Sequence, residues 1–250
     1  MLISQQLMIL FIEELGIGLI RIPSNTITRE FFILSCNYMA GRLREEDFED
    51  IYNEIKKTPI PKNAYRANIG ATRTTPQRSQ CHGLVRKRSL PMSLSRQSWC
   101  YPRLYRALLE FGRQFCPIQF TSIQVNYNTV SAIHKDKHNE GPTWIVAFGD
   151  YEGGELGIYH LGEPERLIDI RHHPFLFNGS STPHASKPFR GERISLVYHT
   201  QEQTVFPGNH SLNDYTFDAE GYVVWQGRRL TKDNGLPHPL QVRLRNINTQ

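Results

Sequence analysis

Three side chains in the second half of the sequence have the types and spacing expected of a metal site. His134 and Asp136 are two positions apart, so on an extended segment both side chains point to the same side. His184 lies farther along, in the tripeptide Thr-Pro-His, and supplies a second imidazole. Two histidines and one carboxylate on one face of an octahedron leave three positions for a chelating cosubstrate and O2, which suits Fe(II). Taken alone, the His-x-Asp pair also fits a polar surface stretch or a helix cap.

A basic side chain with a suitable spacing follows the second histidine. If residues 188–191 turn the chain, His184 and Arg193 face each other across a hairpin, with β-carbons about 5 Å apart. A guanidinium grips a carboxylate through two parallel hydrogen bonds, so Arg193 is the candidate anchor for an organic acid bound to the metal. Ser195 points the same way and adds a hydroxyl donor. Arg190 is the second candidate for the anchor, although it falls in the predicted turn.

The order and spacing of these residues resemble those of the Fe(II)/2-oxoglutarate oxygenases with a double-stranded β-helix fold. The resemblance covers residues 118–200, about a third of the chain. It implies Fe(II), the cosubstrate 2-oxoglutarate and O2 as cofactors. It also implies that the metal ligands and catalytic residues are His134, Asp136 and His184.

The same resemblance implies how the cosubstrate binds. Arg193, with help from Ser195, corresponds to the residue that binds the distal carboxylate of 2-oxoglutarate. Tyr127 or Asn126, on the strand before the first histidine, resembles the position of another cosubstrate contact. Tyr127 fits a position in the hydrophobic core equally well.

Two stretches narrow the resemblance within that superfamily. Residues 134–137 (His-Lys-Asp-Lys), followed by residues 148–156, look like the TET/JBP group, which oxidises the methyl group of 5-methylcytosine or thymine in nucleic acid. The spacing from His184 to Arg193 is also similar to that of prolyl hydroxylases, and the cysteine-rich region of animal TET proteins has no obvious counterpart. On the basis of the two TET/JBP-like stretches, we expect hydroxylation of a methylated base in DNA. The alternatives are a prolyl-type protein or peptide hydroxylase and a catalytically inactive binding module of the same fold.

The distribution of charge points to an anionic partner. The chain carries a net charge of +5, yet residues 61–115 hold 11 basic side chains against Glu110 alone. Such an Arg-rich stretch suits phosphate contacts, so we expect segment 62–113 to bind DNA or another nucleic acid. A solvated loop, or a loop docked on the acidic remainder of the chain, fits the same composition. The expected substrate or nucleic-acid contacts are Lys135, Lys137, Arg86, Lys87 and Arg88. Trp144 and Tyr151 fit either base stacking or the core.

Regular elements must position these side chains. Apolar residues recur every three or four positions over residues 45–57, with acidic residues first and lysines last, and predict a helix. A second helix is expected over residues 102–115, with Pro102 in its first turn. Residues 62–99 show weak periodicity and predict loops. Short strands separated by turns are expected over residues 120–127, 143–148, 155–159, 166–170, 175–177 and 193–199.

Regularly spaced short strands indicate a β-sandwich or barrel, and the resemblance specifies which kind. The expected fold class is mainly β with flanking helices (α+β), built on a double-stranded β-helix (jelly-roll or cupin-like) core. We divide the chain into an N-terminal helical region packed on the core (1–61), a basic loop-rich segment with a support helix (62–116), the catalytic core (117–200) and a C-terminal extension (201–250).

The N-terminal region and the cysteines bear on the cellular compartment. Residues 7–19 are apolar, but Glu13 and Glu14 interrupt them and no basic residue precedes them, so neither a secretory signal nor a membrane span is expected. The four cysteines are widely spaced and include no C-x-x-C pair, which favours reduced thiols. We expect an intracellular protein, cytoplasmic or nuclear, that makes no membrane contact.

Overall fold

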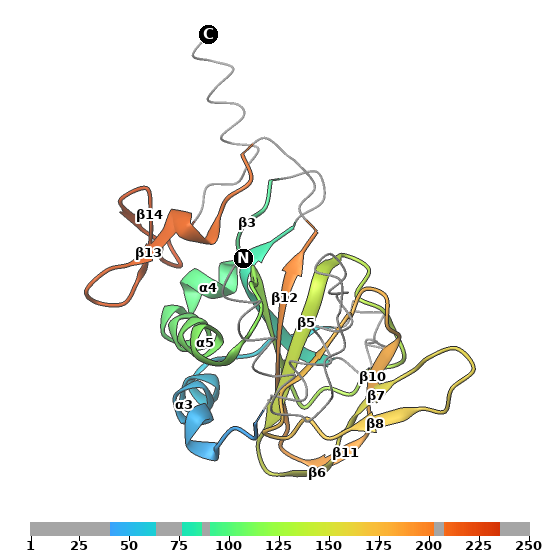
Figure 1. Ribbon diagram of the computed structural model, residues 1–250. Coiled ribbons are helices and arrows are strands. Elements are labelled where there is room, and N and C mark those ends of the chain that lie inside the picture. Colours follow the sequence, from blue (N-terminus) through green and yellow to red (C-terminus); the bar gives the residue numbers. More distant parts are fainter. Residues whose placement is uncertain (1–40, 64–76, 87–90, 203–207, 236–250) are drawn as a thin grey trace, which may run out of the picture.

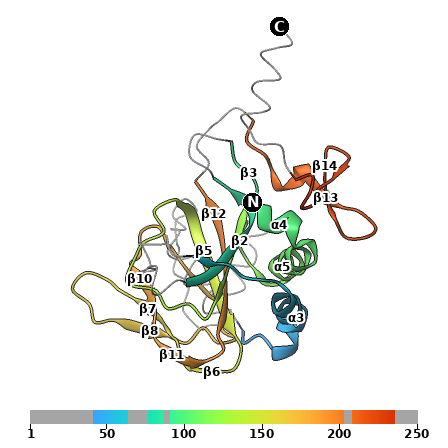
Figure 2. The ribbon, with the colours of Figure 1, turned by 180° about the vertical axis from the view of Figure 1, so that it is seen from behind.

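A large antiparallel sheet forms the centre of the computed structural model, which describes residues 41–63, 77–86, 91–202 and 208–235. Its strand order is β1-β2-β4-β12-β5-β9, with β3 paired to β2. Helices cover one face of this sheet and a smaller sheet layer lies on the other (Figure 1, Figure 2). The strands of the large sheet are β1 (Lys62–Asn63), β2 (Gln77–Val85), β3 (Ser93–Leu94), β4 (Ser122–Tyr127), β5 (Asn139–Phe148), β9 (Phe175–Phe177) and β12 (Ile194–Gln201).

The smaller layer consists of two short antiparallel sheets. One has the order β10-β7-β8 and the other pairs β11 with β6. Their strands are β6 (Tyr151–Gly153), β7 (Leu156–Ile158), β8 (Arg166–Ile168), β10 (His184–Ser186) and β11 (Phe189–Gly191). The chain passes back and forth between the two layers, which is the winding of a double-stranded β-helix. The fold class predicted from the sequence is therefore confirmed: mainly β, with a jelly-roll core and flanking helices.

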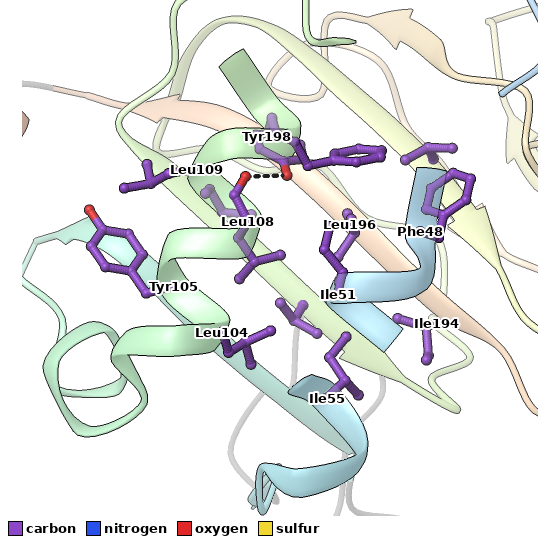
Figure 3. Packing of buried hydrophobic residues seen from close by; sticks show 14 of the residues in the cluster. Phe48, Ile51, Ile55, Leu104, Tyr105, Leu108, Leu109, Ile194, Leu196 and Tyr198 are labelled. Atoms are coloured by element: carbon purple, nitrogen blue, oxygen red, sulfur yellow. Dashed lines mark hydrogen bonds between the residues drawn. The ribbon is translucent and has the colours of Figure 1, made fainter. Parts of the chain in front are cut away.

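Amphipathic helices pack on the outer face of the large sheet. They are η1 (Glu45–Phe48), α3 (Glu49–Lys57), α4 (Arg96–Cys100) and α5 (Pro102–Phe115). Figure 3 shows buried side chains of η1, α3 and α5 meeting Ile194, Leu196 and Tyr198 of β12, each of which is fully buried. The hydroxyl of Tyr198 donates to the carbonyl oxygen of Leu108 at 2.8 Å, so this buried polar group is satisfied. Burial of these apolar faces holds the helices on the sheet.

Strand β12 separates two environments because its side chains alternate. Its even-numbered residues from Ile194 to Tyr198 face the helices, as described above. The intervening positions face the space between the two layers: Ser195, Val197, His199 and Gln201, with Arg193 just before the strand. Part of that space is filled by a second apolar cluster that includes Ile145, Ala147, Leu156, Ile158 and Phe177. The remaining part is open, and it contains the candidate site.

A third small sheet packs beside α4 and α5. It comprises β13 (Tyr215–Phe217), β14 (Val223–Trp225) and β15 (Arg228–Arg229), and η3 (Leu212–Asp214) precedes it. Val223 and Leu230 are fully buried in the helix-side core, so this part of the expected C-terminal extension belongs to the packed structure. Among the helices of the described ranges, none has the length and apolar character needed to cross a membrane.

Most regular elements occur where the sequence predicts them. The helix predicted over residues 45–57 is confirmed as η1 followed by α3, and the helix over 102–115 as α5. The six predicted strands correspond to β4, β5, β7, β8, β9 and β12. The expectation of loops over residues 62–99 is wrong for Gln77–Val85, a nine-residue strand paired along β4. Residues 1–40, which make up most of the expected N-terminal helical region, lie outside the described residues.

The sequence does not reveal β2 because polar side chains occupy its buried positions. Gln80 and His82 pair with Val125 and Ile123 of β4 and face the helices, where they are 4% and 0% exposed. A strand is recognised in a sequence by apolar residues at alternate positions. In β2 the buried alternate positions carry an amide and an imidazole, so the alternation is hidden.

Candidate metal centre

Backbone pairing brings the three predicted metal ligands together. His134 and His184 form an antiparallel bridge in which each backbone N–H donates to the carbonyl oxygen of the other at 3.0 Å. The backbone N–H of Asp136 donates to the carbonyl oxygen of Gly179 at 2.9 Å. The segment that carries His134 and Asp136 is therefore held against the start of β10. Two separate parts of the sequence thus supply one cluster of side chains.

The donor atoms of this cluster are close enough to share one ion. Nε2 of His134 is 3.7 Å from one carboxylate oxygen of Asp136, and Nε2 of His184 is 3.7 Å from the other. All the donor atoms lie within 4.8 Å of one another. Metal–ligand bonds of about 2.0–2.2 Å bring such atoms to a single ion after small side-chain shifts. The two imidazoles and the carboxylate fit a divalent transition metal such as Fe(II).

Backbone carbonyl groups fix the proton position on both imidazoles. Nδ1 of His134 is 2.8 Å from the carbonyl oxygen of Ala132, and Nδ1 of His184 is 2.9 Å from that of Thr182. A carbonyl oxygen only accepts hydrogen bonds, so each Nδ1 carries the proton and each Nε2 keeps its lone pair for a metal. Burial lowers the pKa of His184, against the opposing effect of Asp136, and favours the neutral ring that a metal requires.

The surroundings of Asp136 hold its carboxylate in place and leave it room. Nδ2 of Asn139 donates to Oδ2 of Asp136 at 3.4 Å, and the backbone N–H of Asn139 donates to the Asp136 carbonyl oxygen at 2.9 Å. A β-carbon at Gly179 would lie 3.3 Å from the same carboxylate and 2.9 Å from Oγ1 of Thr143. Gly179 therefore provides the space in which the carboxylate faces both histidines.

A cavity of about 200 Å3 opens between the two sheet layers beside this cluster. Three aliphatic side chains contribute to its wall, namely Ile145, Leu156 and Val197. The rest of the wall is polar and includes Gln124, Asn126, Ser131, Asn139, Ser195, His199 and Gln201. Nδ2 of Asn126 donates to the hydroxyl oxygen of Ser195 at 3.3 Å. The structure thus places Asn126 and Ser195, both predicted cosubstrate contacts, in the same cavity as the metal ligands.

Arg193 lies beyond Ser195 on the same face of the chain and is 1% exposed. Its guanidinium carbon is 5.6 Å from the ring centre of Tyr151 and 5.8 Å from that of Phe189. Its Nε and Nη2 have no hydrogen-bond partner among the described residues, and neither has the buried hydroxyl of Tyr151. Burial lowers the pKa of Arg193, because the charged form loses hydration, and the opposing effects of Tyr151 and Glu155 are smaller. A buried cation with two nitrogens left without a partner among the described residues is costly, so this position fits an anionic ligand.

The path of the chain from His184 to Arg193 differs from the predicted hairpin. Phe189–Gly191 is strand β11, which pairs with β6, and is not a turn between two paired strands. His184 belongs to the smaller layer, whereas Arg193 directly precedes β12 in the large sheet. The expected direct opposition of the two residues is therefore wrong, although both face the interior. Arg190, the second candidate anchor, is exposed on β11.

Tyr127 faces the helices rather than the cavity. Its hydroxyl donates to Oε2 of Glu192 at 2.5 Å, and the guanidinium of Arg78 lies 4.4 Å from its ring centre. In the register of the large sheet Tyr127 pairs with Ile194, which belongs to the helix-side core. Of the two candidates on β4, Asn126 is thus the one that lines the cavity.

Three of the five expected substrate contacts lie within the described residues. Lys135 and Lys137 are exposed on either side of Asp136. Arg86 is also exposed; its backbone N–H donates to Oε1 of the cavity residue Gln201 at 2.8 Å, and its Nη1 is 3.2 Å from a carboxylate oxygen of Glu202. The other two, Lys87 and Arg88, lie outside the described residues.

In the described part of the chain, the C-terminal part of the basic segment lies away from the cavity. Arg103, Arg106 and Arg113 belong to α5, which covers the face of the large sheet opposite to the smaller layer (Figure 1). Nε of Arg106 is 2.8 Å from a carboxylate oxygen of Glu110 on the same helix. These three arginines are therefore on the other side of the sheet from the metal ligands.

Two residues near the site were not predicted in their observed places: His199 was not named as a candidate, and Tyr151 was considered for base stacking or the core. His199 is 6% exposed and lines the cavity. The alternation of β12, counted from Ser195, was the signal that could have found it. Tyr151 lies on β6 beside Arg193, and no local pattern links these two residues. Only the pairing of β6 with β11 brings Tyr151 to that place.

Comparisons with known proteins find similarity in solved structures. No family model matches the chain, and no curated protein matches it. A 2OG-Fe(II) oxygenase family oxidoreductase from Burkholderia pseudomallei is 13% identical, with 71% of this chain and 93% of that chain covered and a TM-score of 0.49. NgTET1 in complex with 5mC DNA is 13% identical (68% and 75% covered, TM-score 0.43), and a Pseudomonas putida prolyl-4-hydroxylase is 11% identical (70% and 100% covered, TM-score 0.43). These likenesses do not specify a substrate.

Proposed function

We propose that this protein is an Fe(II)- and 2-oxoglutarate-dependent dioxygenase that hydroxylates a C–H bond of its substrate. The proposal rests chiefly on the buried guanidinium of Arg193, whose Nε and Nη2 lack partners within the described residues. Ser195, on the same face, lines the cavity that holds the three candidate metal ligands. A dicarboxylate with one end at those ligands and the other at Arg193 would supply the missing counter-charge.

Each residue of the site has a distinct role in this proposal. His134, Asp136 and His184 would hold Fe(II) through the two Nε2 atoms and the carboxylate. When bound, Fe(II) supplies the oxidative decarboxylation of 2-oxoglutarate to succinate and CO2, coupled to insertion of one oxygen atom into the substrate C–H bond. The carbonyl groups of Ala132 and Thr182 keep the protons on Nδ1, so both imidazoles present lone pairs inward.

The remaining residues position the cosubstrate and limit the access of water. Arg193 would bind the distal carboxylate in bidentate fashion, and the buried hydroxyls of Tyr151 and Ser195 would donate to it. Asn126 orients the Ser195 hydroxyl through their hydrogen bond. The apolar cluster between the two sheet layers closes this part of the interior and keeps it dry.

For the substrate we propose a methylated base in DNA, 5-methylcytosine or thymine. The exposed cations Lys135 and Lys137 flank a candidate metal ligand, and Arg86 is bound through its backbone to a residue of the cavity wall. These side chains would contact phosphates while the base turns out of the duplex into the cavity. The polar wall offers amide groups to the edge of a base. A prolyl-type protein or peptide hydroxylase is the alternative.

Formation of succinate tests the enzymatic part of the proposal. Purified protein supplied with Fe(II), 2-oxoglutarate and O2 should form succinate, and the His184→Ala variant should not. A wild-type protein that binds iron and 2-oxoglutarate but forms no succinate with any substrate would be a binding module of the same fold.

Substrate choice needs a second measurement. Methylated duplex oligonucleotides, unmethylated duplexes of the same sequence and proline-rich peptides should be incubated with the active enzyme and analysed by mass. The proposal expects a gain of one oxygen in the methylated duplex alone if the substrate base is 5-methylcytosine, and in both duplexes if it is thymine. Oxygen gained only by the peptides would exclude the DNA base and support the alternative.

A further inference from the structure

Glu192 directly precedes the buried Arg193 in the chain. Because side chains alternate, Glu192 points toward the helices while Arg193 points into the interior. The Glu192 backbone N–H donates to the carbonyl oxygen of Asp150 at 2.7 Å. The Arg193 backbone N–H donates to Oδ1 of Asn128 at 2.8 Å, and the Asn128 N–H donates back to the Arg193 carbonyl oxygen at 2.8 Å. The main chain at this point is therefore held on both sides.

Three donors converge on the Glu192 carboxylate. The hydroxyl of Tyr52 donates to Oε1 at 2.8 Å, and the hydroxyl of Tyr127 donates to Oε2 at 2.5 Å. Nζ of Lys56 is 2.5 Å from Oε2. Tyr52 and Lys56 are one turn apart on α3, so a single face of that helix grips the carboxylate. Hydrogen bonds to a charged group are stronger than neutral ones, so this contact joins α3 firmly to the chain before β12.

We propose that Glu192 is a positioning residue for Arg193: by joining α3 and Tyr127 to the start of β12, it fixes the guanidinium where 2-oxoglutarate binds. This inference rests on the proposed function. It gives Tyr127 a role in cosubstrate binding that is indirect, through Glu192, rather than the direct contact considered from the sequence. The Arg193 side chain is packed against Tyr151, Phe189 and Gly154, but no hydrogen bond among the described residues fixes its Nε or Nη2. The direction of the guanidinium therefore depends on where the backbone starts, and the Glu192 contacts hold that backbone.

Cosubstrate binding by variants of Glu192 tests the proposal. The Kd for 2-oxoglutarate should be measured by calorimetry on the Fe(II)-loaded protein without oxygen, and KM and kcat by succinate formation with oxygen. We expect Glu192→Ala to raise both Kd and KM about tenfold, with kcat at saturating 2-oxoglutarate within about twofold of the wild type. Glu192→Gln keeps one acceptor oxygen, which can take the place of Oε2 and accept from Tyr127 and Lys56, while its NH2 group can donate to the Tyr52 hydroxyl oxygen. Its Kd should therefore stay within about threefold.

Two further variants separate an effect on cosubstrate binding from a general loss of stability. The double change Tyr52→Phe with Tyr127→Phe removes two donors without removing the carboxylate, and it should raise Kd in the same direction as Glu192→Ala. Glu165 provides a matched control, because it accepts from the hydroxyl of Tyr159 at 2.5 Å and from Nζ of Lys187 at 2.9 Å. Glu165→Ala removes a similar Tyr–Lys–Glu cluster from the smaller layer and should leave Kd unchanged.

The possible results separate this inference from the proposed function. A wild-type protein that binds no 2-oxoglutarate would overturn the proposed function, and this inference with it. A wild-type protein that binds it, together with Glu192→Ala or the double tyrosine variant at the wild-type Kd, would overturn the positioning role alone. An equal loss in Glu165→Ala, or a fall in kcat at unchanged KM, would also overturn that role.

Discussion

Gly154 lies directly against the side chain of Arg193. A β-carbon at Gly154 would come within 2.9 Å of the Arg193 Cδ and 3.0 Å of its Nε, closer than packed atoms approach. We therefore expect Gly154→Ala to displace the guanidinium and to weaken 2-oxoglutarate binding by at least about tenfold, as a calorimetric Kd would show.

A matched glycine separates this contact from backbone strain. Gly154 has φ 74° and Gly162 has φ 80°, so alanine is strained at both positions. A β-carbon at Gly162 would meet no atom within 4 Å. Gly162→Ala should therefore lose a similar amount of stability and keep the wild-type Kd. Equal effects of the two substitutions on Kd would show that the contact with Arg193 is unimportant.

Arg193→Met should change stability and cosubstrate binding in opposite directions. The substitution replaces a buried cation, two of whose nitrogens have no partner among the described residues, by an apolar side chain of similar length, so the free energy of unfolding without ligand should rise by on the order of 1–4 kcal/mol. The same variant should lose 2-oxoglutarate binding by at least about a hundredfold. Denaturant unfolding and calorimetry measure the two quantities. Destabilisation of the ligand-free protein would mean that Arg193 is paired within the fold.

His184→Ala should remove most of the bound metal. The substitution leaves one imidazole and one carboxylate, and we expect metal content after dialysis to fall from about one ion per chain to below about a tenth. His138→Ala is the control, because the His138 side chain is 80% exposed and lies four residues after His134. Loss of metal in both variants, measured by elemental analysis, would argue against the assigned ligand set.

Stability should fall in acid because of His82. Its ring is fully buried, neither ring nitrogen has a partner within the described residues, and burial lowers its pKa to about 3. The unfolded chain, with an ordinary pKa of about 6.5, binds a proton that the folded chain excludes between these values. The contribution of His82 is therefore complete above pH 6.5 and is lost by about 1.4 kcal/mol per pH unit as the pH falls toward 3.

The variant His82→Leu isolates this effect. The free energy of unfolding of the variant should fall less steeply with decreasing pH than that of the wild type, and the difference should grow between pH 6.5 and pH 4. His138→Leu, which changes an exposed histidine, should follow the wild-type curve. Parallel curves for His82→Leu and the wild type would show that His82 is protonated in the folded protein.

The sequence predicted those features that depend on local pattern. The apolar periodicity of α3 and α5 and the alternation of β4, β5 and β12 were sufficient to place these elements. The spacing of His134 and Asp136 predicted that both would face one point, and the structure brings them together with His184. A two-residue spacing on an extended chain leaves little freedom, so this part of the site was accessible without coordinates.

Features that depend on contacts between distant segments were not predicted. The segment 188–191 has the composition of a turn, yet it forms β11 because β6 is available to pair with it. Tyr151 and Glu192 acquire their neighbours only through that winding and through the packing of α3. Strand β2 was missed because its buried positions are polar, so a rule based on hydrophobicity passed over it.

The bridge between His134 and His184 has a mechanical consequence. An ion held by both residues and by Asp136 would cross-link two points about 50 residues apart in the chain, as a disulfide does. Such a link closes a loop that contains β5 to β9, which are three of the five strands of the smaller layer together with one edge of the large sheet. Loading the metal would therefore reduce the opening of this half of the barrel and slow its digestion by proteases.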